Sequence, residues 1–303
     1  MKILEYLSEE YVCLNSYLSE LRQEIINNME EDNNKKKNIK YPEPTEIRIS
    51  TMTIISNLNS IINIEDLFEL LELDDNIKND IYPRIEFLKY GGDKIKGNTK
   101  INKKKKNKKN YFQNQITICI LLDINKKINM KLFKNGKIQL TGIKDINIIN
   151  NGCNYIFDII RKFNEKNSII EDTSKFNYIN DNYDIVLINS DFKVNYLLNR
   201  DNIFKLLINM NFFVIFEPDI YPGVNLKYFI NSNNKNKGIC NCTEKCNGKG
   251  NGVGDGNCKR ITIAIFQSGS IIITGSKNFN QIDICFEFIN KLLKNNFYNI
   301  IDD

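Results

Sequence analysis

The sequence of 303 residues contains no histidine and no tryptophan, and only five prolines. Without histidine, neither a Ser-His-Asp nor a Cys-His catalytic arrangement can form, and a metal site must use other ligands. No apolar run approaches the roughly 18 residues that a membrane-spanning helix needs. The amino-terminus also lacks the apolar block of a secretory signal peptide. These absences argue against histidine-dependent enzymes and against membrane insertion.

Two stretches have the alternating pattern of a β-hairpin. In residues 259–277, two short apolar runs flank Gln267, Ser268 and Gly269, a connection typical of a hairpin turn. Residues 128–144 repeat the pattern, and Phe133 precedes Phe266 by 266 − 133 = 133 residues. Alternate positions are aliphatic, and we assign them to the core: Ile128, Met130, Leu132, Ile138, Leu140, Ile261, Ile263, Ile265, Ile271 and Ile273.

The intervening positions form a second face, which suits a flat, partly apolar partner better than it suits water. It comprises Lys131, Phe133, Lys137, Gln139, Thr141, Thr262, Ala264, Phe266, Ser270, Ile272 and Thr274. The alternative is that Phe133 and Phe266 are core rings, but the period of two argues against it.

Three further pairs of segments extend the similarity in the same order along the chain. They are 61–63 with 197–199, 80–83 with 219–222, and 88–90 with 226–228. Several blocks at near-constant spacing indicate a direct repeat. We predict an α+β fold with an amino-terminal region at 1–46, repeats at 47–163 and 183–295, a linker at 164–182 and a tail at 296–303. Whether residues 86–90 or 116–122 form the second strand of the first repeat stays open.

Three segments lie outside the repeated plan. Residues 2–30 carry apolar side chains at spacings of three and four, which predicts a heptad helix that either packs on its own domain or binds a partner. Residues 91–115 are rich in lysine and form either a solvated loop or a phosphate-seeking segment. Residues 231–259 combine four cysteines with several glycines.

These four cysteines, half of the chain's eight, suggest a metal site. Four thiolates can close a tetrahedral Zn²⁺ site, and glycine lets the backbone wrap around it. The spacing is not that of a standard zinc ribbon, so free thiols in a loose loop are the alternative. With no secretion signal, the cysteines favour a reducing compartment. The candidate ligands are Cys240, Cys242, Cys246 and Cys258.

Several motifs resemble those of the TATA-box-binding protein family. In the second repeat they are residues 216–223, 265–269 and 273–277, and in the first repeat they are residues 132–137 and 140–142. The resemblance implies a saddle, in which two direct repeats form one curved antiparallel sheet with helices on the convex side. The concave side would lie on the minor groove of DNA, where large rings wedge between base steps and kink the duplex.

The resemblance also implies roles for particular residues. Phe133 and Phe266 would each be one ring of a wedge pair, with Tyr82 and Tyr221 as the other rings. Thr141 and Thr274 would bind base acceptors, while Gln139 and Ile272 would face the groove. Lys131 and Lys137 could reach phosphates. Glu217, Asp219 and Ile220 resemble the loop that holds transcription factor IIB, and a plain acidic turn is the alternative.

The sequence therefore predicts a non-enzymatic transcription initiation factor that binds A/T-rich promoter DNA, with a factor IIB-like protein and RNA polymerase as partners. The alternative is a scaffold of the same fold without DNA binding. Tyr at two wedge positions and Gln139 depart from the family pattern, and the family's paired asparagines have no clear match beyond Thr53 and Asn189. Abundant Asn, Ile and Lys suggest an A/T-rich genome, and hence the nucleus or, for a large DNA virus, the viral factory or virion.

Overall fold

The computed structural model describes residues 41–73, 81–91, 94–97, 113–232, 238–253 and 255–302. The heptad helix predicted at 2–30 and most of the lysine-rich segment lie outside these ranges. The elements are β1 (Arg48–Asn57), α2 (Ile64–Leu70), β2 (Arg84–Tyr90), β3 (Lys94–Lys96), β4 (Gln115–Leu121), β5 (Lys127–Phe133), β6 (Lys137–Ile143), η1 (Ile146–Ile148), α3 (Ile149–Asn167), β7 (Asp184–Lys193), α4 (Arg200–Asn209), β8 (Phe213–Glu217), β9 (Tyr221–Ile230), β10 (Lys259–Ile265), β11 (Ser270–Ser276), α5 (Phe279–Asn295) and α6 (Phe297–Ile300).

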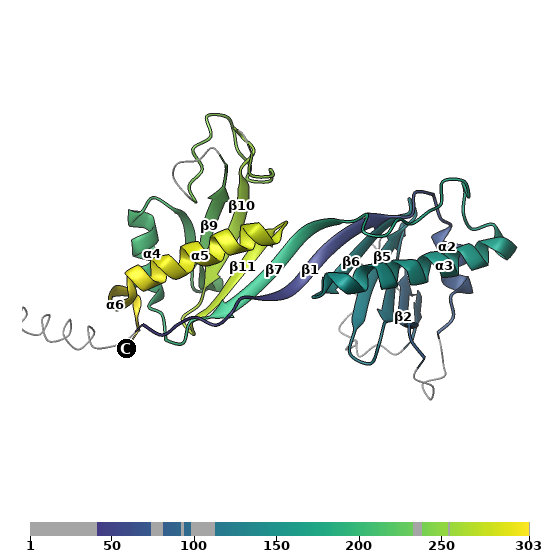
Figure 1. Ribbon diagram of the computed structural model, residues 1–303, viewed down its shortest axis with the longest axis horizontal. Coiled ribbons are helices and arrows are strands. Elements are labelled where there is room, and N and C mark those ends of the chain that lie inside the picture. Colours follow the sequence, from purple (N-terminus) through teal and green to yellow (C-terminus); the bar gives the residue numbers. More distant parts are fainter. Residues whose placement is uncertain are drawn as a thin grey trace, which may run out of the picture.

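The described strands form one antiparallel sheet in the order β3-β2-β4-β5-β6-β1-β7-β11-β10-β9-β8. Strands β1 and β7 pair at its centre and join two halves of like topology, as Figure 1 shows. Each half carries a long helix, α3 or α5, across the same side of the sheet. The predicted α+β class and the single sheet of two direct repeats are confirmed.

The core lies between the sheet and its helices. Helix α3 buries Ile149, Cys153, Ile156 and Ile160, whose spacing places them on one side of the helix. The strand residues that alternation assigned to the core are all fully buried. Because strand side chains alternate, the positions between them face away from the helices, which confirms the predicted facing of both hairpins.

One part of the predicted repeat alignment is wrong. Helices α2 and α4 keep the spacing of 200 − 64 = 136 residues. Beyond them, β4 pairs with β5 as β9 pairs with β10, so β4 is the counterpart of β9 and β2 that of β8. The match of 88–90 with 226–228 therefore joins β2 with β9, which occupy different places in the sheet. The match of 81–83, just before β2, with 220–222, at the start of β9, fails in the same way.

The two insertions consequently lie at opposite ends of equivalent strands. Residues 91–115 come before β4 in the chain. Its counterpart β9 is preceded only by the short turn after β8. The cysteine-bearing segment instead follows the end of β9 and leads into β10. The sequence alignment placed both insertions after equivalent strands, and the sheet order overturns that placement.

The predicted linker and tail are parts of the packed repeats. In the linker, Ile169 and Ile170 are buried, and the Phe176 ring stacks on Phe157 with centroids 4.8 Å apart. In the tail, α6 buries Phe297 and Ile300. No described helix is long and apolar enough to cross a membrane.

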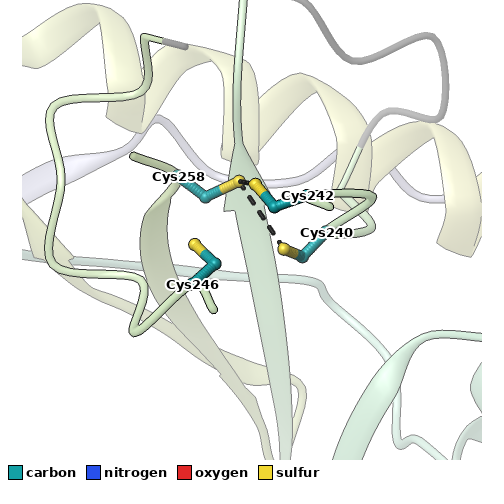
Figure 2. A group of neighbouring side chains, drawn as sticks. All are labelled: Cys240, Cys242, Cys246 and Cys258. Carbon is teal, nitrogen blue, oxygen red and sulfur yellow. Dashed lines mark hydrogen bonds between the residues drawn. The ribbon is translucent and has the colours of Figure 1, made fainter. Parts of the chain in front are cut away.

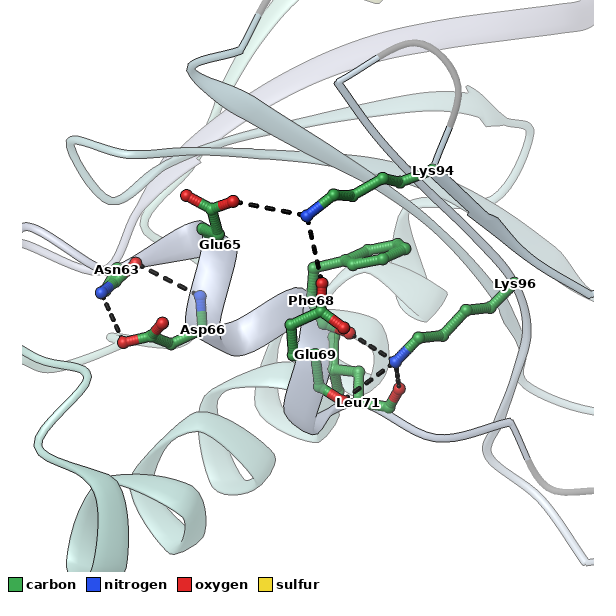
Figure 3. A network of polar contacts seen from close by, with 8 residues as sticks. All are labelled: Asn63, Glu65, Asp66, Phe68, Glu69, Leu71, Lys94 and Lys96. Atoms are coloured by element: carbon green, nitrogen blue, oxygen red, sulfur yellow. Dashed lines mark hydrogen bonds and ion pairs between the residues drawn. The ribbon is translucent and has the colours of Figure 1, made fainter.

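A polar network fixes the short edge strand β3 to helix α2 (Figure 3). Asn63 caps the start of α2 by accepting from the Asp66 N–H at 3.3 Å. At the other end, the Lys96 ammonium donates to the carbonyls of Phe68, Glu69 and Leu71 at 2.7, 3.0 and 2.9 Å. A cation there satisfies carbonyl groups that the helix leaves unpaired and complements the helix dipole.

We expect Lys96→Met to lower the free energy of unfolding by about 1 to 3 kcal/mol, because three carbonyls lose a charged donor. Lys94→Met is the matched control, since Lys94 contacts Glu65 and Glu69 at the surface and its removal should change stability much less. Urea titration measures both. Equal losses for the two variants would contradict the capping role.

Candidate nucleic-acid interface

The side of the sheet opposite α3 and α5 carries no helix among the described residues, and we call it the open face (Figure 1). It is built from the alternate strand positions that do not enter the core. Its residues near the centre of the sheet are Thr51, Thr53, Ile55, Gln139, Thr141, Leu187, Asn189, Asp191, Ile272 and Thr274.

Four polar residues occupy equivalent places at the centre of the open face. Thr53 lies opposite Thr141 across β1 and β6, and Asn189 lies opposite Thr274 across β7 and β11. The Thr274 hydroxyl donates to the Asn189 side-chain oxygen. With its oxygen so engaged, the Asn189 amide presents its nitrogen, a donor, to whatever binds the face. The structure thus confirms that Thr53 and Asn189 occupy equivalent positions.

Next to these four residues, each repeat has a cross-strand pair of one polar and one apolar residue, but the polar residue is on a different strand in each repeat. In the first repeat Gln139 lies beside Ile55, and in the second Ile272 lies beside Asp191. Each repeat thus places one apolar and one polar residue here, with the strands exchanged. The polar Gln139, which departs from the family pattern, is thus paired with the apolar Ile55. Comparison of the hairpin sequences alone did not reveal this pairing.

The Asp191 carboxylate is neutralised within the open face. The Arg48 guanidinium donates to it at 2.6 Å, and the Ser50 hydroxyl also donates to it. A carboxylate left alone on this face would repel nucleic-acid phosphates. Neither Arg48 nor Asp191 was among the predicted site residues, because their charges meet only across the β1–β7 pairing.

Two of the predicted rings meet at the outer part of the second repeat. The centroids of Tyr221 and Phe266 are 5.6 Å apart, with the ring planes at 63°. Gly223 lies beneath them, since a Cβ there would be 2.9 Å from Tyr221 Cε1 and 3.0 Å from Phe266 Cε1. Both rings can therefore pack against the backbone here because Gly223 has no side chain. Its place two residues after Tyr221 on an alternating strand is the signal that could have identified it.

Tyr82 lies away from its predicted partner. Phe133 pairs with Gln115 at one end of β4, whereas Arg84, two residues after Tyr82, pairs with Leu121 at the other. Six residues of strand span about 20 Å. Tyr82 instead lies under the Arg84 guanidinium, 5.0 Å from its ring centroid. By the register of the same strands, the counterpart of Tyr221 in the first repeat is Gln113, an exposed residue two positions before β4 that supplies no ring.

Phe133 itself is half-buried and faces outward from the core, as predicted. Lys131 lies between Gln139 and Thr117 on the same face, and Lys137 is exposed at the start of β6. In the second repeat, the Lys227 ammonium donates to the Thr262 hydroxyl at 3.0 Å. Burial and the nearby Arg260 charge lower the pKa of Lys227. Sequence comparison did not find Lys227 as a site residue because it was matched to the wrong strand.

The predicted partner-binding residues lie in the tight turn between β8 and β9. The Ile220 N–H donates to the Glu217 carbonyl at 3.0 Å and closes the turn. Glu217 and Asp219 are exposed, and Ile220 is 80% exposed. Beside them, β8 ends the sheet with Phe213 and Ile215 exposed. An acidic turn beside an apolar edge strand is suited to protein contacts.

The four predicted metal ligands converge in space (Figure 2). Their sulfur atoms all lie within 4.8 Å of one another. The cluster lies beyond the end of β9, at the opposite end of that strand from Tyr221, so it is separate from the ring pair.

The chain is similar to a curated protein and to a solved structure. No protein-family model matches the chain. A curated protein of Acanthamoeba polyphaga mimivirus, named TATA-box-binding protein-like, is 33% identical over 268 residues. This match confirms the resemblance to TATA-box-binding proteins. The alignment covers 82% of the chain but 65% of that relative's length. Among solved structures, Methanococcus jannaschii TBP matches at 16% identity with a TM-score of 0.47, over 83% of this chain and 99% of the other.

We expect Gly223→Val to separate the Tyr221 and Phe266 rings while leaving the fold intact, because the added methyl groups occupy the space under both rings. NMR contacts between the two rings should disappear while the circular dichroism spectrum stays that of the wild type, because the exposed Tyr221 ring can move aside into solvent. Asn225→Ala, on the same strand, should keep the ring contacts. Persistence of those contacts in the valine variant would show that Gly223 does not set the pair.

Proposed function

We propose that this chain is a TATA-box-binding-protein-like transcription initiation factor, with no enzymatic activity, that binds and bends A/T-rich promoter DNA through the minor groove. The observation that carries the proposal is the ring pair of Tyr221 and Phe266, settled over Gly223 on an open face with polar donors at its centre.

The centre of the open face has the chemistry that the minor groove calls for. That groove presents mainly acceptors, the adenine N3 and the thymine O2, so A·T pairs are told from G·C pairs. The Asn189 amide nitrogen and the hydroxyls of Thr53 and Thr141 are donors on the open face. Around them, Ile55, Leu187 and Ile272 supply apolar area. Donors set in a smooth, apolar surface favour A/T-rich DNA.

The rings supply the means of bending. Apolar side chains that enter a base step unstack it and kink the duplex, and pyrimidine–purine steps such as TA lower the cost. Phe133 is the last residue of β5, and Phe266 directly follows the last residue of β10. The proposal assigns one wedge to each, with Tyr221 completing the pair in the second repeat. Tyr82, which the register separates from Phe133, has no part in the wedge.

The edge of the second repeat suits the partners that initiation requires. The exposed acidic turn of Glu217 and Asp219, with Ile220 at its tip, offers charge and one apolar anchor. Among the described strands, β8 is the last of the sheet on this side, so its outer edge can offer backbone groups to a further strand. We propose a factor IIB-like protein as the partner here, with RNA polymerase recruited in turn.

A scaffold of the same fold without DNA binding is the second candidate. The observation that favours it is the Asp191 carboxylate, an acidic group on the face that would meet phosphates. The two functions differ in whether DNA contacts the open face.

A single tryptophan at each wedge position separates the two candidates, because the natural chain has none. We expect the fluorescence of Phe133→Trp and Phe266→Trp to be quenched when an A/T-rich duplex is added, since the indole would stack on bases. Tyr298→Trp, on α6 outside the open face, is the control and should not respond. If the duplex quenches the fluorescence of none of the three variants, or only that of the control, the scaffold function is favoured.

The corresponding alanine variants test bending itself. Phe133→Ala and Phe266→Ala should each reduce the bend of an end-labelled duplex, measured by FRET, because one wedge is lost. The circular dichroism spectra should be unchanged, since neither ring belongs to the core. Undiminished bending with both rings removed would contradict the mechanism.

Neutralisation of Asp191 gives an independent test. We expect Arg48→Gln to weaken DNA binding, because the carboxylate then faces the phosphates without its partner. Adding Asp191→Asn to this variant should restore most of the affinity, as no negative charge remains. Gel shifts at several salt concentrations measure both variants. If the double variant binds as weakly as Arg48→Gln, Arg48 itself holds the DNA.

A further inference from the structure

The described part of the loop between β9 and β10, residues 238–253 and 255–258, follows a defined path but has almost no core of its own. Between Cys240 and Cys258, the buried residues among those described are Gly248, Gly252 and Cys258. Val253, a large apolar residue of the loop, is 64% exposed. Hydrophobic contacts on this scale cannot offset the entropy lost when the backbone is ordered. Another interaction must hold the loop in shape.

Backbone hydrogen bonds fasten the loop to both strands that it joins. The Phe229 N–H donates to the Gly238 carbonyl at 2.9 Å, and the Arg260 N–H donates to the Gly248 carbonyl at 2.8 Å. Gly238 and Gly248 have φ values of +90° and +71°, which other residues rarely adopt. These glycines bend the chain so that four cysteines, spread over the loop, face one point (Figure 2).

The sulfur atoms have the spacing of a tetrahedral metal site. Cys242 Sγ and Cys258 Sγ are 3.3 Å apart, and Cys258 Sγ and Cys240 Sγ are 3.7 Å apart. All four sulfurs lie within 4.8 Å. Zinc bound at about 2.3 Å from each of four thiolates separates them by about 3.8 Å, a value that these distances bracket. All four cysteines are free of disulfide bonds.

Groups around the cluster are placed to support thiolates. The Asn231 amide donates to Cys258 Sγ at 3.3 Å and to Cys242 Sγ at 3.8 Å. Donors of this kind orient metal ligands and stabilise their negative charge.

We propose that Cys240, Cys242, Cys246 and Cys258 bind one Zn²⁺ ion, which holds the loop closed against β9 and β10. A purely thiolate, tetrahedral set favours a soft metal, and the chain has no histidine to compete for the site. Four protein ligands leave no open coordination position, so the ion is structural rather than catalytic. The cluster lies beyond the carboxyl end of β9 whereas Tyr221 begins that strand, so metal binding is independent of the wedge.

Elemental analysis of the full-length protein, purified without chelator, should give one zinc per chain. Cys246→Ser should lose the zinc, whereas Cys119→Ser, which alters a buried thiol of β4 outside the loop, should keep it. Asn231→Ala should retain the ligands but bind zinc about 10- to 100-fold more weakly, because it removes a donor to two sulfurs.

Cobalt provides a test that does not depend on how a variant folds. Wild-type protein stripped of metal and titrated with Co²⁺ should give a thiolate-to-metal charge-transfer band that saturates at one equivalent, and Zn²⁺ should abolish it. Hydrogen exchange should show faster exchange at 238–258 in the stripped protein, with β1 and β7 unchanged. Absence of stoichiometric metal together with absence of the cobalt band would overturn the proposal. Stoichiometric iron in place of zinc would overturn the assignment of the metal.

Discussion

The antiparallel pairing of β1 with β7 is the interaction on which the rest of the structure depends. It joins the two halves of the sheet, so its register decides which residues of one repeat meet which residues of the other. Because strand side chains alternate, a slip of one residue would exchange the core and open faces of a whole strand. Thr51 pairs with Asn189 and Thr53 with Leu187, and all four residues lie on the open face. The register of the two strands shifts just before Thr51 and just after Thr53. Ile188, on the other side of β7, joins the core of the first repeat.

The two repeats differ in detail on either side of this shared centre but contribute to one surface. Gln139 with Ile55, and Ile272 with Asp191, give the same balance of polar and apolar area from opposite strands. The negative charge of Asp191 is balanced by the guanidinium of Arg48 on the neighbouring strand. The open face is thus a property of paired strands, and neither hairpin taken alone displays it.

The sequence predicted the faces well because period-two alternation is a local signal. Ile128, Met130 and Leu132 are fully buried, as are Ile261, Ile263 and Ile265. Phe133 and Phe266 each follow one of these runs by one residue and are only half-buried. The outer strands were harder, since an Asp-Ile-Tyr-Pro sequence occurs in both repeats at positions that the sheet does not equate. Only the pairing of β4 with β5, a contact between strands, shows that Tyr82 lies far from Phe133.

The two ends of the sheet illustrate why long-range contacts escape such predictions. An edge strand exposes unpaired backbone groups, and each repeat deals with its edge differently. In the first repeat, β3 is added outside β2, and Lys96 ties it to the end of α2. In the second, β8 remains the edge beside the acidic turn, while the added chain forms the cysteine loop at the far end of β9. Both segments lie away from the central strands β6, β1, β7 and β11, so neither the Lys96 cap of α2 nor the cysteine cluster alters the pairing that sets the open face.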